Sequence, residues 1–439
     1  MNVALVVLDT LRKDTFERHF DWLPGLRFER AFSTGNWTVP AHASLFTGRY
    51  PGEVGVHAKH TTLDCPEQTL AERLAGAGYM TRAFSSNVNV SPPFKFDRGF
   101  REFEVSHRLR GLSPDVFDWE TFISSHRDEG PVRYLRALYR CVFGKCDTRA
   151  SLRRGWEIKK RDLGWATEQP DAGAKEALAW IRETAFGSNE FLFCNLMEAH
   201  APYAPPEAYR TTGADVTDVT TFNALLATIE GGPPAADDDL LRRAYDDAVK
   251  YLSDVYRSLF EELRESFDLV ITVGDHGECF GEDGIYQHAV GMRPELVHVP
   301  LVVSGDDLEG THAGAVSLLD VHATVLDVAG IDTAGHGHSL LGGSPSRTAF
   351  AEYHGVSEQN RQAVESEGHD PDPYDHRLCA VGTGDAYGYE TFDGFKPADA
   401  SDLRRAVDEH LATTEWREPG PDDEIPETVR RRLEDLGYA

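Results

Sequence analysis

A set of short apolar runs without polar–apolar alternation constrains the fold most strongly. They are Val3–Leu8, Phe191–Leu196, Leu269–Val273 and Leu301–Val303. A strand buried on both faces gives a continuous apolar run, which is typical of a parallel sheet covered by helices. Helical patterns lie between the runs, at Gln68–Ala75, Ala174–Ala185 and Leu240–Glu265. The sequence therefore predicts an α/β domain with a parallel-core sheet and helices on both faces.

The chain of 439 residues is long enough for more than one unit. A stretch with several glycines near Gly335–Ser346 predicts a boundary between a large first domain, residues 1–345, and a small α+β subdomain, residues 346–439. In the second unit we expect a strand hairpin region at Arg377–Phe395 and a closing helix at Glu427–Leu436. The polar segment 356–376 is predicted to be a surface loop.

The charge balance excludes some classes of partner. The chain carries 44 Lys and Arg against 73 Asp and Glu, a formal net charge of −29, which repels nucleic acid and anionic lipid. Such a surface suits a halophilic cytoplasm, where salt screens close charges. The N-terminus shows no signal-peptide pattern, and no apolar stretch reaches the roughly 20 residues that span a bilayer. We therefore expect a cytoplasmic protein without a transmembrane segment.

A basic segment at about residues 130–162 interrupts this acidic chain, with arginines and lysines interleaved with Tyr134, Leu135, Leu138, Tyr139 and Val142. Two interpretations stay open. The segment is either a solvated helical face with a packed apolar stripe, or a cap that attracts an anionic substrate or a membrane surface.

Three of the predicted strands run into groups that bind metals or transfer protons. Val3–Leu8 is followed by Asp9, Leu269–Val273 by Asp275 and His276, and Phe191–Leu196 by Glu198 and His200. Ligands of open α/β sheets bind at the carboxyl ends of the strands. The sequence therefore predicts that these side chains converge on one site.

The segment Gly35–Arg49 carries the strongest local signal. Pro40 suits the first turn of a helix, which places Thr38 at or just before the helix N-terminus. Unpaired backbone N–H groups at that end favour an anion. A threonine hydroxyl is a poor nucleophile without a metal or a base, and an Asp-Asp-His metal site beside Thr38 would supply that activation.

At these motifs the chain resembles sulfatase-like enzymes of the alkaline phosphatase superfamily. The opening N-V-A-L-V-V-L-D-T-L-R-K-D resembles their first strand, and T-V-P-A-H-A-S-L-F-T-G-R-Y-P resembles their nucleophile motif, C/S-x-P-S/A-R-x-x-L-x-T-G. Further similar segments are M-E-A-H-A-P-Y at 197–203, G-D-H-G-E-C-F-G-E-D-G at 274–284, H-V-P-L at 298–301 and D-V-H-A-T-V-L-D-V-A-G at 320–330. The motifs occur in order and cover most of the chain.

The resemblance implies an alkaline-phosphatase-like fold and a divalent cation, Mn, Zn, Mg or Ca. Its implied ligands are Asp9, Asp275, His276 and Thr38, with Thr38 also the nucleophile. The resemblance further implies a small anionic ester as substrate, possibly linked to a sugar or a lipid. His200 and His288 would face it as leaving-group acid or anion binders, and we expect substrate contacts from His42 and Asn87.

Departures from the family pattern bear on the reaction. Threonine cannot be oxidised to the formylglycine of true sulfatases, His42 replaces the arginine of their motif, and F-S-S-N at 84–87 replaces their lysine-bearing segment. We therefore expect a metal-dependent hydrolase that cleaves a phosphate, phosphonate or sulfate ester through a covalent Thr38 intermediate, with phosphorus esters preferred. The alternatives are a phospho-alcohol transferase acting on a sugar or lipid, and a non-catalytic anion-binding protein on the same scaffold.

Overall fold

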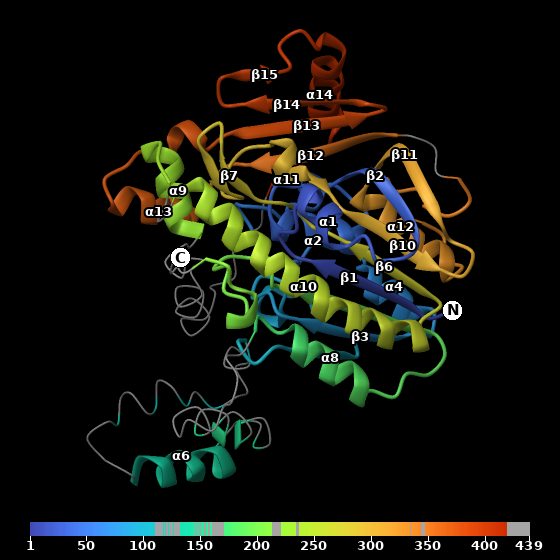
Figure 1. Cartoon of the computed structure of the whole chain (residues 1–439), viewed down its shortest axis with the longest axis vertical. Helices are drawn as coiled ribbons and strands as arrows, with labels where there is room; N and C mark the ends of the chain where they lie inside the picture. The colour runs from blue at the N-terminus through green and yellow to red at the C-terminus, as the bar shows by residue number, and fades with distance from the viewer. Residues whose placement is uncertain are drawn as a thin grey trace.

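The computed structural model describes residues 1–109, 171–212, 221–233, 237–333, 335–343 and 347–418, together with Val132–Phe143 and scattered neighbouring positions between 117 and 159. Its centre is a large sheet with strand order β11-β2-β10-β6-β1-β5-β3-β4, to which β9 adds beside β2 (Figure 1). The strands are β1 (Val3–Leu8), β2 (Leu26–Phe32), β3 (Met80–Ser85), β4 (Glu102–Val105), β5 (Glu190–Leu196), β6 (Leu269–Val273), β9 (His298–Val299), β10 (Leu301–Gly305) and β11 (Gly310–Ser317).

The middle of this sheet is parallel, as predicted. Strands β6, β1, β5, β3 and β4 pair in parallel, and in the central pair Val3 lies opposite Phe191 and Leu8 opposite Leu196. Every residue of β1, β5 and β6 is buried. Burial on both faces explains why these strands are continuous apolar runs.

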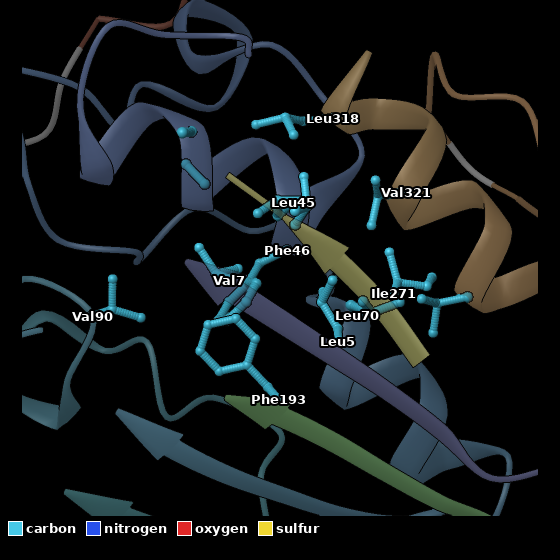
Figure 2. Packing of buried hydrophobic residues seen from close by; sticks show 14 of the residues in the cluster. Leu5, Val7, Leu45, Phe46, Leu70, Val90, Phe193, Ile271, Leu318 and Val321 are labelled. Atoms are coloured by element: carbon cyan, nitrogen blue, oxygen red, sulfur yellow. The ribbon is translucent and has the colours of Figure 1, made fainter. Parts of the chain in front are cut away.

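Helices cover both faces of the sheet, which confirms the predicted layers. Leu5 and Val7 of β1 point to the face covered by α2 (Thr38–Thr47), α4 (Leu70–Gly76) and α12 (Leu318–Val328), and Figure 2 shows this packing. Ala4, Val6 and Leu8 point to the opposite face, which is covered by α1 (Lys13–His19), α8 (Ala174–Glu183) and α10 (Asp238–Ser266). The predicted helices Gln68–Ala75, Ala174–Ala185 and Leu240–Glu265 correspond to α4, α8 and α10.

Strand β10 corrects one expectation, because the run at Leu301–Val303 was predicted to join a parallel sheet. It instead lies antiparallel to β6 on one side and to β2 on the other. The connection from β6 contains the hairpin β7 (Cys279–Glu282) and β8 (Ile285–Gln287) and the short helix α11 (Pro294–Val297). The chain therefore runs back along β6 in the opposite direction, whereas a parallel neighbour would need a crossover connection.

The C-terminal unit is the predicted α+β subdomain. It contains an antiparallel sheet of β12 (Thr348–His354), β13 (Arg377–Thr383), β14 (Ala386–Thr391) and β15 (Gly394–Lys396), with helix α14 (Ser401–Thr413) packed against it. This confirms the hairpin region at Arg377–Phe395. The expected closing helix Glu427–Leu436 lies outside the described residues.

The expectation of a loop at 356–376 is wrong in part, since α13 (Glu358–Ser366) and a 3-10 turn (Asp372–Tyr374) form there. The Ser357 hydroxyl accepts the Asn360 backbone N–H at 3.2 Å and caps α13, and Val364 anchors the helix in the core. A helix with one buried residue shows too little apolar periodicity in its sequence to be predicted.

The remaining described elements are α3 (Pro51–Val54), α6 (Val132–Phe143), α9 (Thr221–Glu230) and the 3-10 turns Pro92–Phe94 and Glu207–Tyr209. Helix α6 belongs to the basic segment, and the rest of that segment is described only at single positions. Among the described helices, none combines the length and apolar character needed to cross a membrane.

Candidate active site

Three side chains from the carboxyl ends of two neighbouring strands meet in the interior. Asp9 follows β1, and Asp275 and His276 follow β6, so the parallel pairing of the strands brings them together. One ligand atom from each lies within 4.8 Å of the others. The His276 Nε2 atom is 3.4 Å from Asp275 Oδ2 and 4.0 Å from Asp9 Oδ1. All three side chains are fully buried.

Thr38 reaches this cluster from α2, where it is the first residue of the helix. Its hydroxyl oxygen lies 3.3 Å from His276 Nε2 and 3.3 Å from the Asn87 amide nitrogen. In the described part of the chain no side chain caps the α2 N-terminus, where Trp37 occupies the capping position. The unpaired N–H groups and the helix dipole at this end favour a bound anion beside the Thr38 hydroxyl.

The two carboxylates differ in their environments. Burial raises the pKa of Asp275 well above its ordinary value, and the nearby Asp9 carboxylate raises it further. Burial also opposes ionisation of Asp9, but His276, His200 and His42, together with the Asn195 amide, hold the pKa of Asp9 below its ordinary value. Within the described residues, only histidine nitrogens lie within ion-pair distance of either carboxylate.

The donor set fits a divalent cation. Asp275 Oδ2 is buried and accepts no hydrogen bond from the residues that the structure describes. The ring of His276 directs Nδ1 at the Gly277 carbonyl, 3.0 Å away, so Nδ1 carries the proton and Nε2 presents its lone pair to the carboxylates. Two carboxylates and a neutral imidazole are ligands of Zn, Mn and related ions, and a cation would relieve the repulsion between Asp9 and Asp275.

Asn87, just after β3, and Asn195, in the adjacent strand β5, support Asp9. The Asn87 amide donates to Asp9 Oδ2 at 2.8 Å, and the Asn195 amide donates to the same oxygen at 3.1 Å. Asn87 therefore bridges Asp9 and Thr38. Asn195 was missed from the sequence, although an amide within the apolar run Phe191–Leu196 is a signal, since a buried amide must find partners.

His42, expected to contact substrate, is buried beside Thr38 and Asn195. It is fully buried, its Nδ1 donates to the Thr38 carbonyl at 2.9 Å, and its Nε2 faces the Asn195 amide at 3.3 Å. Burial lowers its pKa to about 4, so the ring is neutral at neutral pH. With both nitrogens engaged inside the protein, His42 is better suited to positioning Thr38 and Asn195 than to binding substrate.

His200 and His288 lie side by side at the site. Their ring centres are 5.2 Å apart, and the His288 ring is 4.6 Å from that of His276. His200 Nδ1 donates to the Ala201 carbonyl at 2.7 Å, which fixes the ring. Burial, with a smaller contribution from His288, lowers the pKa of His200 to about 4. Burial likewise lowers the pKa of His288, and the neighbouring His276 lowers it further.

Glu278 is a further site residue that sequence reasoning did not identify. Its Oε1 lies 2.9 Å from His288 Nδ1, and its Oε2 accepts the Tyr203 hydroxyl at 2.8 Å. Burial raises the pKa of Glu278 to about 7. Such a carboxylate fixes the ring orientation and the tautomer of the histidine it contacts. The signal in the sequence is an acid two residues beyond His276, in G-D-H-G-E.

Thr10 holds both carboxylates and is strained. Its hydroxyl donates to Asp9 Oδ1 at 2.9 Å, and its backbone N–H donates to Asp275 Oδ1 at 3.1 Å. Its φ of 62° lies in the left-handed region, which a β-branched residue rarely adopts. Strain of this kind costs on the order of 1–3 kcal/mol and persists where surrounding contacts enforce it, commonly at functional sites.

The comparisons with known proteins agree with this fold. The family model described as Sulfatase matches residues 2–331. A choline-sulfatase of Rhizobium meliloti (strain 1021) is 22% identical over 379 residues, which are 75% of this chain and 68% of that protein. The crystal structure of a phosphonate monoester hydrolase of Agrobacterium radiobacter superposes with a TM-score of 0.63 at 19% identity, covering 94% of this chain and 95% of the other.

A phosphonate monoester hydrolase from Silicibacter pomeroyi is similar in fold, with a TM-score of 0.61, 18% identity and 94% of each chain covered. These structural likenesses show the alkaline-phosphatase-like fold. Since the family model matches most of the chain, this protein belongs to the sulfatase family and is a sulfatase-like ester hydrolase.

Proposed function

We propose that this protein hydrolyses phosphate or phosphonate esters in a metal-dependent reaction, with Thr38 as the nucleophile. The observation that carries the proposal is the position of the Thr38 hydroxyl, at the uncapped N-terminus of α2 and 3.3 Å from His276 Nε2. Two fully buried carboxylates lie beside the same histidine. Threonine cannot form the aldehyde hydrate on which sulfate-ester cleavage by formylglycine depends.

Asp9, Asp275 and His276 would hold the cation, with the Thr38 hydroxyl as a further ligand. When bound, a divalent cation lowers the pKa of a coordinated hydroxyl and neutralises charge on a nonbridging oxygen of the ester. Asn87 orients the Thr38 hydroxyl through its amide. The N–H groups of the first turn of α2 are available to the anionic group of the substrate.

The reaction then proceeds in two displacements. Thr38 Oγ1 forms a bond to phosphorus while the bond to the leaving oxygen breaks, so the hydroxyl loses one proton and the leaving alkoxide gains one. Either His200 or His288 relays this proton from Thr38 to the leaving oxygen through Nε2, since each ring is neutral and is fixed through Nδ1. In the second step the hydroxyl group of water bonds to phosphorus, and the other water hydrogen returns to the Thr38 oxygen.

The experiment compares kcat/KM for matched aryl phosphonate, phosphodiester, phosphate and sulfate substrates in Mn, Zn, Mg and Ca. We expect the wild type to prefer a phosphorus ester. Thr38→Ala should lower kcat by at least about 1000-fold, as loss of a nucleophile does. Mass spectrometry of acid-quenched enzyme should find the covalent adduct on the peptide containing Thr38. The exposed Thr311 provides the control variant, Thr311→Ala, which should retain full activity.

Two outcomes would count against the proposal in different ways. A clear preference for aryl sulfate, with Thr38 still essential, would replace the ester and leave the site intact. Full activity of Thr38→Ala on every substrate would remove Thr38 as the nucleophile.

A further inference from the structure

Large apolar side chains are exposed mainly in one place. The described residues expose seven large hydrophobic side chains, and five of them lie on α6: Leu135, Leu138, Tyr139, Val142 and Phe143. A sixth, Trp156, lies in the same basic segment. The exposed fractions of Leu135, Tyr139 and Phe143 are 69%, 64% and 72%. Contiguous exposed apolar surface of this kind marks an interaction site.

The five side chains share one face of the helix, because their spacing from Leu135 is three, four, seven and eight residues. The opposite face is the packed one. There Ala137 and Cys141 are fully buried in a cluster with Trp119 and Phe122. Helix α6 therefore packs through its small residues and leaves its large ones in solvent, the reverse of an ordinary surface helix.

The border of this apolar face is basic. Arg136 and Arg140 are exposed beside it, Arg133 lies on the same flank, and α6 contains no acidic residue. Lys159 adds a further cation, 4.5 Å from the Tyr134 ring. In a chain of net charge −29, these cations lie beside five of the seven large hydrophobic side chains that the described residues expose.

We propose that α6 docks this protein on the surface of an anionic lipid bilayer. An interfacial helix combines a basic flank with an apolar face that carries leucine and aromatic residues, as α6 does. Its 12 residues are too few to span a bilayer, which takes about 20, so the helix lies in the interface. A second copy of α6 is a poorer partner, since face-to-face contact would bring the arginine borders together.

The acidic body of the protein does not prevent this contact. Figure 1 shows α6 set apart from the large sheet and the helices that flank it. Electrostatic repulsion between exposed charges and a membrane is screened over about 10 Å at 0.1 M salt and over shorter distances at higher salt. Burial of the apolar face in the interface does not depend on salt in this way.

The test is co-sedimentation of the full chain with vesicles of phosphatidylcholine alone or mixed with phosphatidylglycerol. We expect binding to the mixed vesicles and weaker binding to the neutral ones. The triple variant Leu135→Gln, Tyr139→Ser, Phe143→Gln should bind at least about tenfold more weakly, because it removes three insertable side chains. Arg136→Gln with Arg140→Gln should weaken binding to the mixed vesicles and leave binding to neutral vesicles unchanged.

The matched control is Arg404→Gln with Arg405→Gln, two exposed arginines on α14, which should bind as the wild type does. Circular dichroism and thermal melting establish that each variant is folded. Wild type that ignores the mixed vesicles, or a folded triple variant that binds them fully, would overturn the proposal. So would a wild-type dimer in light scattering that the triple variant converts to a monomer while vesicle binding is absent from both.

Discussion

Asp275 presents a buried carboxylate oxygen to which no group of the described residues donates a hydrogen bond, which gives a sharp test of the cation site. In Asp275→Asn, the amide oxygen can still accept the N–H groups of Thr10 and His276, now bound at 3.1 and 2.9 Å. The variant loses the negative charge that would bind a cation. We therefore expect metal content to fall to background, measured by plasma mass spectrometry after dialysis against Mn or Zn.

The same variant should separate metal binding from folding. Metal should raise the melting temperature of the wild type and leave that of Asp275→Asn unchanged, because a ligand that binds only the native state stabilises it. Without metal, the variant should be at least as stable as the wild type, since it relieves repulsion between two buried carboxyl groups. Asp254→Asn, at an exposed aspartate on α10, is the control. Wild-type metal content in Asp275→Asn would contradict the assignment.

Glu278 contacts His288 and lies behind the residues that would touch the substrate, so its removal should have a graded effect. In Glu278→Gln the side chain keeps its size but loses the charge that fixes the His288 tautomer. We expect kcat to fall by about 10–100-fold with KM little changed. Nitrogen NMR of the His288 ring should show a shifted tautomer balance. The control is Tyr203→Phe, which removes only the hydrogen bond to the other carboxyl oxygen and should shift the tautomer balance less. An unchanged His288 ring spectrum in Glu278→Gln would assign Glu278 a structural role.

The positions of Asp9, Asp275 and His276 could be predicted from sequence because each follows a buried strand, and parallel strands bring their carboxyl ends together. The residues that support these three side chains were harder to predict. Thr10, Asn195 and Glu278 act through hydrogen bonds whose partners are set by three-dimensional packing. For His42, motif position suggested substrate contact, whereas the ring is enclosed by Phe46, Phe96 and Phe193.

At the scale of elements, existence was easier to predict than direction. The run at Leu301–Val303 is a strand, but apolar content reflects burial and carries no information on strand direction. Only the pairing with β6 and β2 shows that β10 is antiparallel. For helix α13 the existence of the element itself was not predicted. Its sequence is polar, and the helix is stabilised by a serine cap and a single buried valine, which leave little apolar periodicity.

The C-terminal end of α2, the helix that carries Thr38, offers an element-scale prediction. Gly48 ends α2 with φ of 71°, and a Cβ there would lie 2.7 Å from the ring of His322 in α12. Gly330 follows α12 with φ of 70°, and a Cβ there would meet no atom of the described residues within 4 Å. Both positions require the left-handed conformation, but only Gly48 is crowded.

We expect Gly330→Ala to destabilise the fold by about 1 kcal/mol, the cost of a left-handed alanine. Gly48→Ala should cost about 2–4 kcal/mol, because the ring of His322 must also move. Urea unfolding of the two variants measures both values, and their difference isolates the crowding between α2 and α12. Equal losses of stability in the two variants would mean that the His322 ring can move aside at no cost in free energy.

At the scale of the whole molecule, the two sheets meet beside the candidate site. The Glu352 backbone N–H in β12 donates to the Thr34 carbonyl at 2.9 Å, in the loop that leads to Thr38. The Glu352 carboxylate accepts the Gly52 N–H at 2.9 Å, and it contacts His354 at 3.0 Å and His410 of α14 at 2.9 Å. This buried carboxylate is therefore one of the contacts that join the C-terminal sheet to the segments near Thr38.

The pH dependence of stability should report this junction. Burial opposes ionisation of Glu352, but its bonds to His354 and His410 lower its pKa from 4.5 to about 2. A carboxylate with a depressed pKa stabilises the folded state above its unfolded pKa, and this stabilisation is lost as pH falls from about 4.5 to about 2.

Glu352→Gln should therefore lower the free energy of unfolding by roughly 3 kcal/mol at pH 7 and flatten its decline below pH 4.5. Denaturant unfolding at a series of pH values measures both effects, with Glu409→Gln on the exposed side of α14 as the control. If Glu352→Gln matched the wild type at pH 7, or declined as steeply between pH 4.5 and 2.5, the ionised carboxylate would not stabilise this junction.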